Sequence, residues 1–507
     1  MNRNSTAILA TAIFFSMLAS SGVRPNTPDR SGNTHRAAPS IQTKVKEQAP
    51  KSADVEKTGE SDYRGEMDHL LEQYCQDGTE QKKCSLQDEN FVVAIVPDPV
   101  HTHLALYFDR TIDTIEEALQ DDGYIFYQAI VPWDQETHPE SDDFTLRLTA
   151  KRYQEGKEHL PGVMLFRPSG DLYAPKDPLI VMLVGENPTG GVEEEQFSNA
   201  IHQILDRTGT KRKDELSLRI LGPTFSGSLS SLKRLLTCEK IPCYKKTTIL
   251  SGTISGRDAV DDFQQTLKNF QIIEPGPPKI TFDTFQESDR VMLERFIEFI
   301  ARDGYGNRNY PVSHIAELSE DETAYGSMRH SAIQFAFPDV LQLYFPREIS
   351  QLRAAYQDNS AAGTGADRLP IQALPHNYGV TGADDDTVAS FSQKQTPLSQ
   401  EAVLLSIVTE LRKHAIEFVV LNATDPLDTL FLSHYLRKAY PQGRIVTINA
   451  DMLFPREVED TSLHGILAIS TYSVAPSANH QFHQLWQTKT ERMFPSSSEI
   501  GTYNAMH

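Results

Sequence analysis

The residues with the clearest chemical potential lie in 218–236, which reads L-R-I-L-G-P-T-F-S-G-S-L-S-S-L-K-R-L-L. A short apolar run stopped by Gly-Pro predicts the end of a strand, and leucines at helical spacing after S-G-S predict a helix. The unpaired amides of the helix start and the hydroxyls of Ser226 and Ser228 would then meet at one place, which suits a carboxylate or another anion. The alternative is an ordinary helix cap.

Two further clusters carry groups that bind metals or transfer protons. His101 and His103 could share a metal ion, but two histidines without a third placed ligand are typical of a solvated loop, so no metal site is expected. Glu320, Asp321 and Glu322 could act as acid and base, but a solvated turn is the favoured interpretation.

Motifs of known enzymes are missing from the sequence. No G-x-S-x-G, H-E-x-x-H or C-x-x-C occurs, and Ser228 stands where a phosphate loop requires lysine. No nucleophile lies beside a base in the segments singled out. Catalysis and a cofactor are therefore not expected.

Length and charge narrow the classes of protein. The 507 residues can bury a large core and indicate two or three domains, and 39% of them are hydrophobic, as in soluble proteins. The net charge of -21 excludes nucleic acid as a partner, because binding phosphates needs clustered Lys and Arg.

The N-terminus predicts export. Residues 1–21 carry one positive charge, an apolar run and then small residues, which is typical of a cleaved secretory signal; an uncleaved anchor is the alternative. Residues 22–62 are rich in Ser, Pro, Thr and Lys with almost no large apolar residue, which predicts a disordered tether.

Four cysteines support an oxidising compartment. Cys75 lies near Cys84 and Cys238 near Cys243, and an even count in an exported chain predicts disulfides, with pairing by proximity as the favoured connectivity. Zinc is the rejected alternative, because C-x4-C has no matching His or second Cys pair.

Apolar runs alternate with amphipathic runs, which predicts parallel sheets covered by helices on both faces. Eleven strands are too many for one ordinary sheet, so we expect two lobes that divide near 283–289. The predicted strands are 91–96, 124–131, 179–184, 218–221, 247–250, 280–282, 312–318, 341–345, 418–421, 444–448 and 465–469. The predicted helices include 64–74, 193–206, 258–270, 289–301, 400–414 and 427–439.

The predicted domains follow from these patterns. Residues 63–285 with part of the C-terminus form lobe 1, 286–475 form lobe 2, and 476–507 return towards lobe 1, which is left incomplete. The stretches 357–397 and 135–177 lack a sustained period and predict insertions, the second with a small hairpin. Trp133 is expected either to cover the cleft or to pack against the second insertion.

Four segments together resemble the type I periplasmic binding proteins, especially the branch with amino-acid binding proteins and receptor ectodomains. They are I-L-G-P-T-F-S-G-S at 220–228, I-L-S-G-T-I-S at 249–255, A-E-L-S-E-D-E-T-A-Y-G at 316–326 and F-V-V-L-N-A-T-D-P-L-D at 418–428. The resemblance implies two Rossmann-like α/β lobes with parallel sheets and a cleft between them.

The resemblance also implies ligand-binding residues. Hydroxyls and amides on the first lobe would hold an anion, while an aromatic ring and a carboxylate on the second would hold a cation. Carried over position by position, the implied set is Ser226, Ser228, Ser251, Thr253, Tyr325, Asn422, Asp425 and Asp451.

Two departures from the family pattern concern the cleft. The family's first strand runs into a glycine-rich loop, whereas here V-P-D-P-V-H-T-H at 96–103 is bulky and could close the pocket. G-T-Y-N-A at 501–505 resembles the start of the last lobe 1 helix, yet only two residues follow it.

The expected function is therefore extracytoplasmic binding of a small, amino-acid-like polar solute by closure of two lobes, for a membrane transporter or a sensor subunit. The alternative is a non-catalytic envelope scaffold with a degenerate cleft that contacts other proteins. An enzyme of flavodoxin-like topology is a third interpretation. The protein is expected in the periplasm or outside the cell, either soluble or tethered to the membrane.

Overall fold

The computed structural model describes the residues of the two sheets and their helices. They are 63–70, 72, 86–133, 152–170, 177–238, 241–273, 279–303, 308–321, 337–347, 349–361, 396–456, 463–474 and 493–507. All of them belong to one compact unit, Lys51–His507. The predicted signal, tether, Cys75, Cys84 and Tyr325 lie outside the described residues. None of the helices in these ranges is both long enough and apolar enough to cross a membrane.

The first sheet has eight strands and a parallel centre. Its strand order is β10-β9-β6-β1-β4-β3-β2, with β5 paired to β4. The central strands are apolar and buried along nearly their whole length, as expected for a parallel sheet covered on both faces. The parallel strands are β1 (Phe91–Pro97), β4 (Leu179–Asn187), β6 (Ser217–Leu221), β9 (Lys246–Ser251) and β10 (Ile280–Thr284); the antiparallel ones are β2 (Tyr124–Ile130), β3 (Gly162–Pro168) and β5 (Gly191–Val192).

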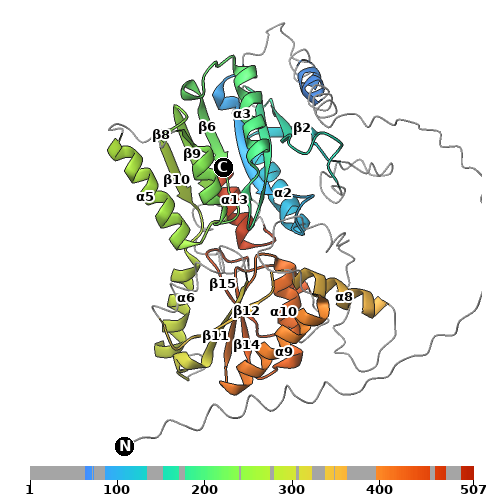
Figure 1. Ribbon diagram of the computed structural model, residues 1–507, viewed down its shortest axis with the longest axis vertical. Coiled ribbons are helices and arrows are strands. Elements are labelled where there is room, and N and C mark those ends of the chain that lie inside the picture. The colour runs from blue at the N-terminus through green and yellow to red at the C-terminus, as the bar shows by residue number, and fades with distance from the viewer. Residues whose placement is uncertain are drawn as a thin grey trace, which may run out of the picture. The chain divides into compact units, whose positions relative to one another are not determined.

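Alternate residues of the first sheet feed two separate cores, which Figure 1 shows as helices on the sheet's two faces. One core holds residues of α3 (Glu194–Thr208), α4 (Ser228–Leu235) and α5 (Arg257–Ile273). The other holds residues of α2 (Ala105–Asp121) and α13 (Ser497–Met506). The last helix of the chain therefore covers the same face as the first long one.

The second sheet has five strands, all parallel, in the order β12-β11-β13-β14-β15. Its two faces form separate cores, one under α8, α9 and α10 and the other under α6 (Figure 1). The strands are β11 (Ile315–Glu320), β12 (Leu341–Phe345), β13 (Phe418–Asn422), β14 (Arg444–Ile448) and β15 (Leu467–Ile469). The helices are α6 (Asp289–Glu298), α8 (Ile349–Ala361), α9 (Pro397–Lys413) and α10 (Pro426–Ala439).

Both sheets repeat one topology. In each, the first parallel strand lies between the second and the third, and the fourth and fifth follow outward, which gives the order 2-1-3-4-5. The order reverses between β1 and β6 in the first sheet and between β11 and β13 in the second. Ligands of open α/β sheets bind outside the carboxyl ends of the strands at such a reversal. These orders confirm the predicted class of two α/β lobes, each built on parallel strands in a Rossmann-like arrangement.

Most predicted strands are present, with shifted ends. The strand predicted at 312–318 begins later, because Val312–His314 form a 3-10 turn before β11. The strand predicted at 465–469 begins at Leu467, after Gly465 with a φ of 81°. Helix α8 extends to Ala361, into the stretch predicted as an inserted loop at 357–397.

The insertion at 135–177 is partly described. Its predicted strand at 163–166 is β3, which pairs with β2 and β4, whereas residues 144–148, predicted as its hairpin partner, lie outside the described residues. Trp133 is 3% exposed and packs edge-on against Phe108 of α2 and Tyr153 of the insertion. Of the two alternatives for this tryptophan, packing against the insertion is therefore the one observed.

The predicted pairing of Cys238 with Cys243 is confirmed. The disulfide closes a short hairpin of β7 (Thr237–Cys238) and β8 (Ile241–Pro242), which follows α4 directly. It fixes the chain between α4 and β9 without reaching the strand ends that face the second sheet.

Candidate functional site

A pocket lies between the carboxyl ends of parallel strands of the two sheets. The empty space between its walls is about 250 Å³, of which only about one water molecule's worth is open to a water-sized sphere. The first sheet contributes the loops after β1 and β4, and the second contributes residues that follow β11, β12 and β13. The lining residues are Thr102, His103, Leu104, Pro188, Glu320, Arg347 and Thr424.

Glu320 is the buried carboxylate of this pocket. It is the last residue of β11 and is 2% exposed, so the prediction of a solvated turn is wrong for this residue. β11 extends two residues beyond the predicted end of the strand at residue 318, and Glu320 is therefore part of the buried strand. Burial raises the pKa of Glu320 to about 7, while the Thr424 hydroxyl, which donates a hydrogen bond to it, opposes the shift.

The loop after β1 is shaped by Asp98, which is fully buried. One oxygen of this carboxylate accepts hydrogen bonds from the amides of Val100 at 2.8 Å and His101 at 2.7 Å. The Thr102 hydroxyl donates to the Asp98 carbonyl at 2.6 Å. This turn replaces the expected glycine-rich loop and sets His103 at the pocket.

Arg347 connects the two sheets across the pocket. It follows β12 and is 5% exposed, and its Nη1 donates a hydrogen bond to the hydroxyl of Thr189, which follows β4, at 3.1 Å. A buried guanidinium presents several donors in one plane and suits a carboxylate or another planar anion. The second sheet thus gives the pocket a buried carboxyl group, Glu320, and a buried guanidinium, Arg347.

The junction at 222–228 binds an anion that the protein supplies itself. Glu186, near the end of β4, is fully buried and accepts hydrogen bonds from the amides of Thr224 and Phe225. Ser228 is fully buried beside this carboxyl group. The amides that hold Glu186 precede α4 and are not those of the helix start, so ligand binding at the helix start and by Ser228 stays a prediction.

The remaining hydroxyls predicted on the first sheet have local partners. The Ser226 oxygen accepts from the amide of Gly256 at 3.1 Å. The Ser251 hydroxyl donates to the Pro223 carbonyl at 2.9 Å, and that of Thr253 donates to the Thr224 carbonyl at 2.8 Å. These bonds tie the β6 and β9 loops together, and a role of these hydroxyls in ligand binding stays a prediction.

The predicted residues of the second sheet flank the pocket without lining it. Asp425 caps α10 by accepting from the Leu427 amide at 2.8 Å and forms an ion pair with Arg353. Asp451 forms an ion pair with Arg110 of α2 at 2.7 Å. Both carboxylates proposed to hold an ammonium group thus already have a buried guanidinium.

Asn422, at the end of β13, is 2% exposed. Its Nδ2 has no hydrogen-bond partner among the described residues. This donor is therefore unsatisfied at the strand reversal of the second sheet, where ligands of such sheets bind. A ligand contact by Asn422 stays a prediction.

The pocket residues that sequence reasoning missed share one signal. Glu320, Arg347 and Thr424 each lie within two residues of the carboxyl end of a parallel strand in the second sheet. Knowledge of the strand order would have selected them, because the order fixes which strand ends flank the reversal. The apolar runs alone gave strand positions but no order.

The carboxyl of Glu186 makes the stability of the fold depend on pH. Burial raises its pKa from 4.5 to about 7, against the hydrogen bonds that favour the charged form. The folded state therefore binds this proton more tightly than the unfolded state, and the stabilisation present below pH 4.5 is lost as pH rises through 7. At 1.36 kcal/mol per pKa unit, this carboxyl should lower the free energy of unfolding by about 2 kcal/mol between pH 5 and pH 8, and Glu186→Gln should not show this decrease. Urea unfolding of both proteins at the two pH values measures the difference. The same decrease in both proteins would refute the prediction.

Comparisons with known proteins give structural similarity without sequence similarity. No protein-family model matches the chain, and no curated protein matches it in sequence. In structure it is similar to an ABC transporter substrate-binding protein from Desulfitobacterium hafniense in complex with Leu, with a TM-score of 0.36, 10% identity, and coverage of 82% of this chain and 81% of the other.

Two further solved structures are similar to the chain. One is a solute binding protein of an ABC transporter from Rhodopseudomonas palustris BisB5 in complex with 3,4-dihydroxy benzoic acid, at a TM-score of 0.41, 10% identity, and coverage of 82% and 78%. The other is a putative branched-chain amino acid ABC transporter protein from Silicibacter pomeroyi, at a TM-score of 0.38, 10% identity, and coverage of 82% and 75%. By their names, these neighbours are proteins of solute transport.

Proposed function

We propose that this protein binds a small polar solute in the pocket between its two sheets, outside the cytoplasm and without catalysis. The observation that carries the proposal is the placement of the pocket at the carboxyl ends of parallel strands of both sheets, β1 and β4 in the first and β11, β12 and β13 in the second. Because the carboxyl ends of the strands in the two sheets face each other, a ligand between them would contact both sheets, whereas one sheet alone would leave one side of the ligand exposed to solvent.

The charges of the pocket favour a solute that carries both signs, such as an amino acid. Glu320 would accept hydrogen bonds from an ammonium group, and Arg347 would donate to a carboxylate. The hydroxyls of Thr102 and Thr424 add neutral donors and acceptors beside them. The net charge of -21 is a property of the whole chain and does not determine which charges the pocket presents to a solute.

Closure of the two lobes is part of the proposal. The space open to solvent in the pocket is too small for an amino acid, so entry requires the lobes to separate. The ion pair between Arg110 and Asp451 and the hydrogen bond from Arg347 to Thr189 join the two sheets, and both would break on opening. We propose lobe boundaries at 63–285 and 286–475, with the C-terminal residues returning to lobe 1.

The partner and the compartment follow from the same proposal. A solute-binding protein delivers its ligand to a membrane transporter or reports it to a sensor subunit, and the sequence at 1–21 predicts export. The disulfide at Cys238 and Cys243 supports an oxidising compartment.

A second candidate function is an envelope scaffold that has kept the lobes and lost the ligand. The small pocket favours it, as do the bulky residues Thr102 and His103 in place of a glycine-rich loop. In that case the contacts between the sheets would hold one permanent conformation for binding other proteins.

Thermal unfolding of the full chain against amino acids, aromatic acids and small anions separates the two functions. A ligand at one hundred times its Kd adds about 2.7 kcal/mol of stability. We expect one compound class to raise the Tm, and we expect Glu320→Gln and Arg347→Ala to abolish the rise. The matched control is Arg295→Ala, which removes an exposed guanidinium.

Ser226→Ala tests the prediction from the sequence in the same assay, because its hydroxyl lies outside the pocket lining. If no compound shifts the Tm of the folded chain, the solute-binding function is refuted and the scaffold is favoured. If ligands shift all variants equally, the pocket is not the binding site.

A further inference from the structure

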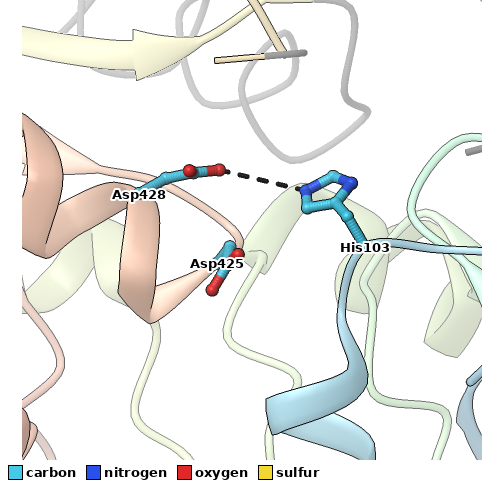
Figure 2. Close-up of side chains that lie close together, drawn as sticks. All are labelled: His103, Asp425 and Asp428. Atoms are coloured by element: carbon cyan, nitrogen blue, oxygen red, sulfur yellow. Dashed lines mark ion pairs between the residues drawn. The ribbon is translucent and has the colours of Figure 1, made fainter. Parts of the chain in front are cut away.

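Three metal-ligating side chains meet between the two sheets, beside the pocket. His103 comes from the loop after β1, and Asp425 and Asp428 come from the start of α10. One ligand atom from each lies within 4.8 Å of the others. Figure 2 shows the imidazole of His103 directed at the carboxylate of Asp428.

The spacing of these atoms fits a shared ion better than a hydrogen bond. His103 Nε2 lies 3.9 Å from Asp428 Oδ2, which is beyond hydrogen-bonding distance. Two atoms that each lie about 2.1 Å from one ion are about 3 to 4 Å apart. An ion between these two atoms would be ligated from both sheets.

Asp428 is a buried carboxylate with unmet hydrogen-bonding capacity. It is 0% exposed, and neither of its oxygens accepts a hydrogen bond within the described part of the chain. Two cationic side chains lie near it, His103 and Arg353, and the Arg353 Nη1 is 2.9 Å from Oδ1. Oδ2 remains directed at His103.

Arg353 orients the two carboxylates without neutralising the region. Its Nη1 also lies 3.1 Å from Asp425 Oδ2, so one guanidinium is shared by two acids. Glu320 adds a third carboxylate and Arg347 a second guanidinium in the neighbouring pocket.

We propose that His103, Asp425 and Asp428 bind a divalent transition-metal ion, with Zn²⁺ as the preferred metal, that joins the two sheets. One imidazole nitrogen and two carboxylate oxygens are a ligand set that Zn²⁺ accepts, and Arg353 holds the carboxylates in place as outer-shell partners of metal ligands do. The three ligands are distinct from Glu320 and Arg347, the charged groups proposed to bind the solute, and His103 lies at the boundary between the two sites because it also lines the pocket.

The test is calorimetric titration of the full chain with ZnCl₂. The protein carries no histidine tag and is first stripped of metal with EDTA. We expect one ion bound per chain and at least about tenfold weaker binding in His103→Ala and in Asp428→Asn. His101→Ala is the matched control, because His101 lies in the same loop but pairs with Asp98 and should leave the affinity unchanged.

Co²⁺ substitution gives a second readout that does not depend on stability. We expect a visible absorption band that titrates to one equivalent and is lost in His103→Ala. Absence of saturable binding, or equal binding by the parent chain and His103→Ala, overturns the site. Preference for Mn²⁺ over Zn²⁺ overturns the zinc assignment.

Discussion

Replacing Arg353 by methionine is expected to lower the free energy of unfolding by about 3 to 5 kcal/mol. The guanidinium is 1% exposed and lies within 3.1 Å of Asp425 and 2.9 Å of Asp428, both fully or nearly fully buried. Methionine fills much of the volume but leaves two like charges in the interior without a counter-charge. Urea unfolding at pH 7 in the presence of EDTA measures the loss.

The matched control is Arg290→Met in α6, whose guanidinium pairs with Glu294 one turn away at the partly exposed surface. Such a pair contributes about 0.3 to 0.5 kcal/mol. Adding Asp425→Asn and Asp428→Asn to Arg353→Met should recover part of the loss, because neutral amides need no counter-charge. If the change in Arg353 costs no more than that in Arg290, the buried network does not stabilise the fold.

Replacing Gly501 by alanine is expected to destabilise the protein by about 1 to 3 kcal/mol, although alanine is the better helix former. Gly501 lies inside α13, where the helix backbone touches the loop after β9. A Cβ at this position would overlap the carbonyl group of Gly252 and come within 2.6 Å of Gln286 Nε2. Gln286 in turn donates to the Ser497 carbonyl at 2.9 Å, so the helix start would shift with it.

Gly65→Ala provides the control, because Gly65 also lies in a helix and a Cβ there meets no atom within 4 Å. It should stabilise the protein by up to about 1 kcal/mol. Urea unfolding gives both free energies, and hydrogen exchange of the α13 amides locates the effect. Stabilisation by both substitutions would show that α13 does not dock against this loop.

The sequence predicted the layers of the fold because burial on both faces leaves an unmistakable pattern. Strands such as β1 and β4 are continuous apolar runs, and no competing element produces such runs at this length. Helix α13 was expected only from the resemblance at 501–505, since S-S-E-I-G-T-Y-N-A-M has no amphipathic period and contains a glycine. Its position depends on the close approach of Gly501 to Gly252, which is a tertiary contact.

The candidate site was predicted in kind but not residue by residue. The turn at 222–228 does hold a carboxyl group, but that group is Glu186 of β4, and its donors are the amides of Thr224 and Phe225, not those of the helix start. Local sequence shows the donors of a site and cannot show which distant acceptor reaches them first. For the same reason His103 looked solvated, since its two aspartates lie more than three hundred positions away in the chain.

Helix α13 is made last but packs on the first sheet, so the first lobe cannot finish folding before the second lobe has been synthesised. Ala505 lies in the same core as Phe108 and Ile112 of α2, and the Tyr503 hydroxyl donates to Asp121 at the other end of that helix. During synthesis, the ribosome releases α2 and the first sheet long before α13, with the whole second sheet made in between. We therefore expect the part of this face beside α2 to stay uncovered until translation has passed residue 506, so that the lobe made first is completed last.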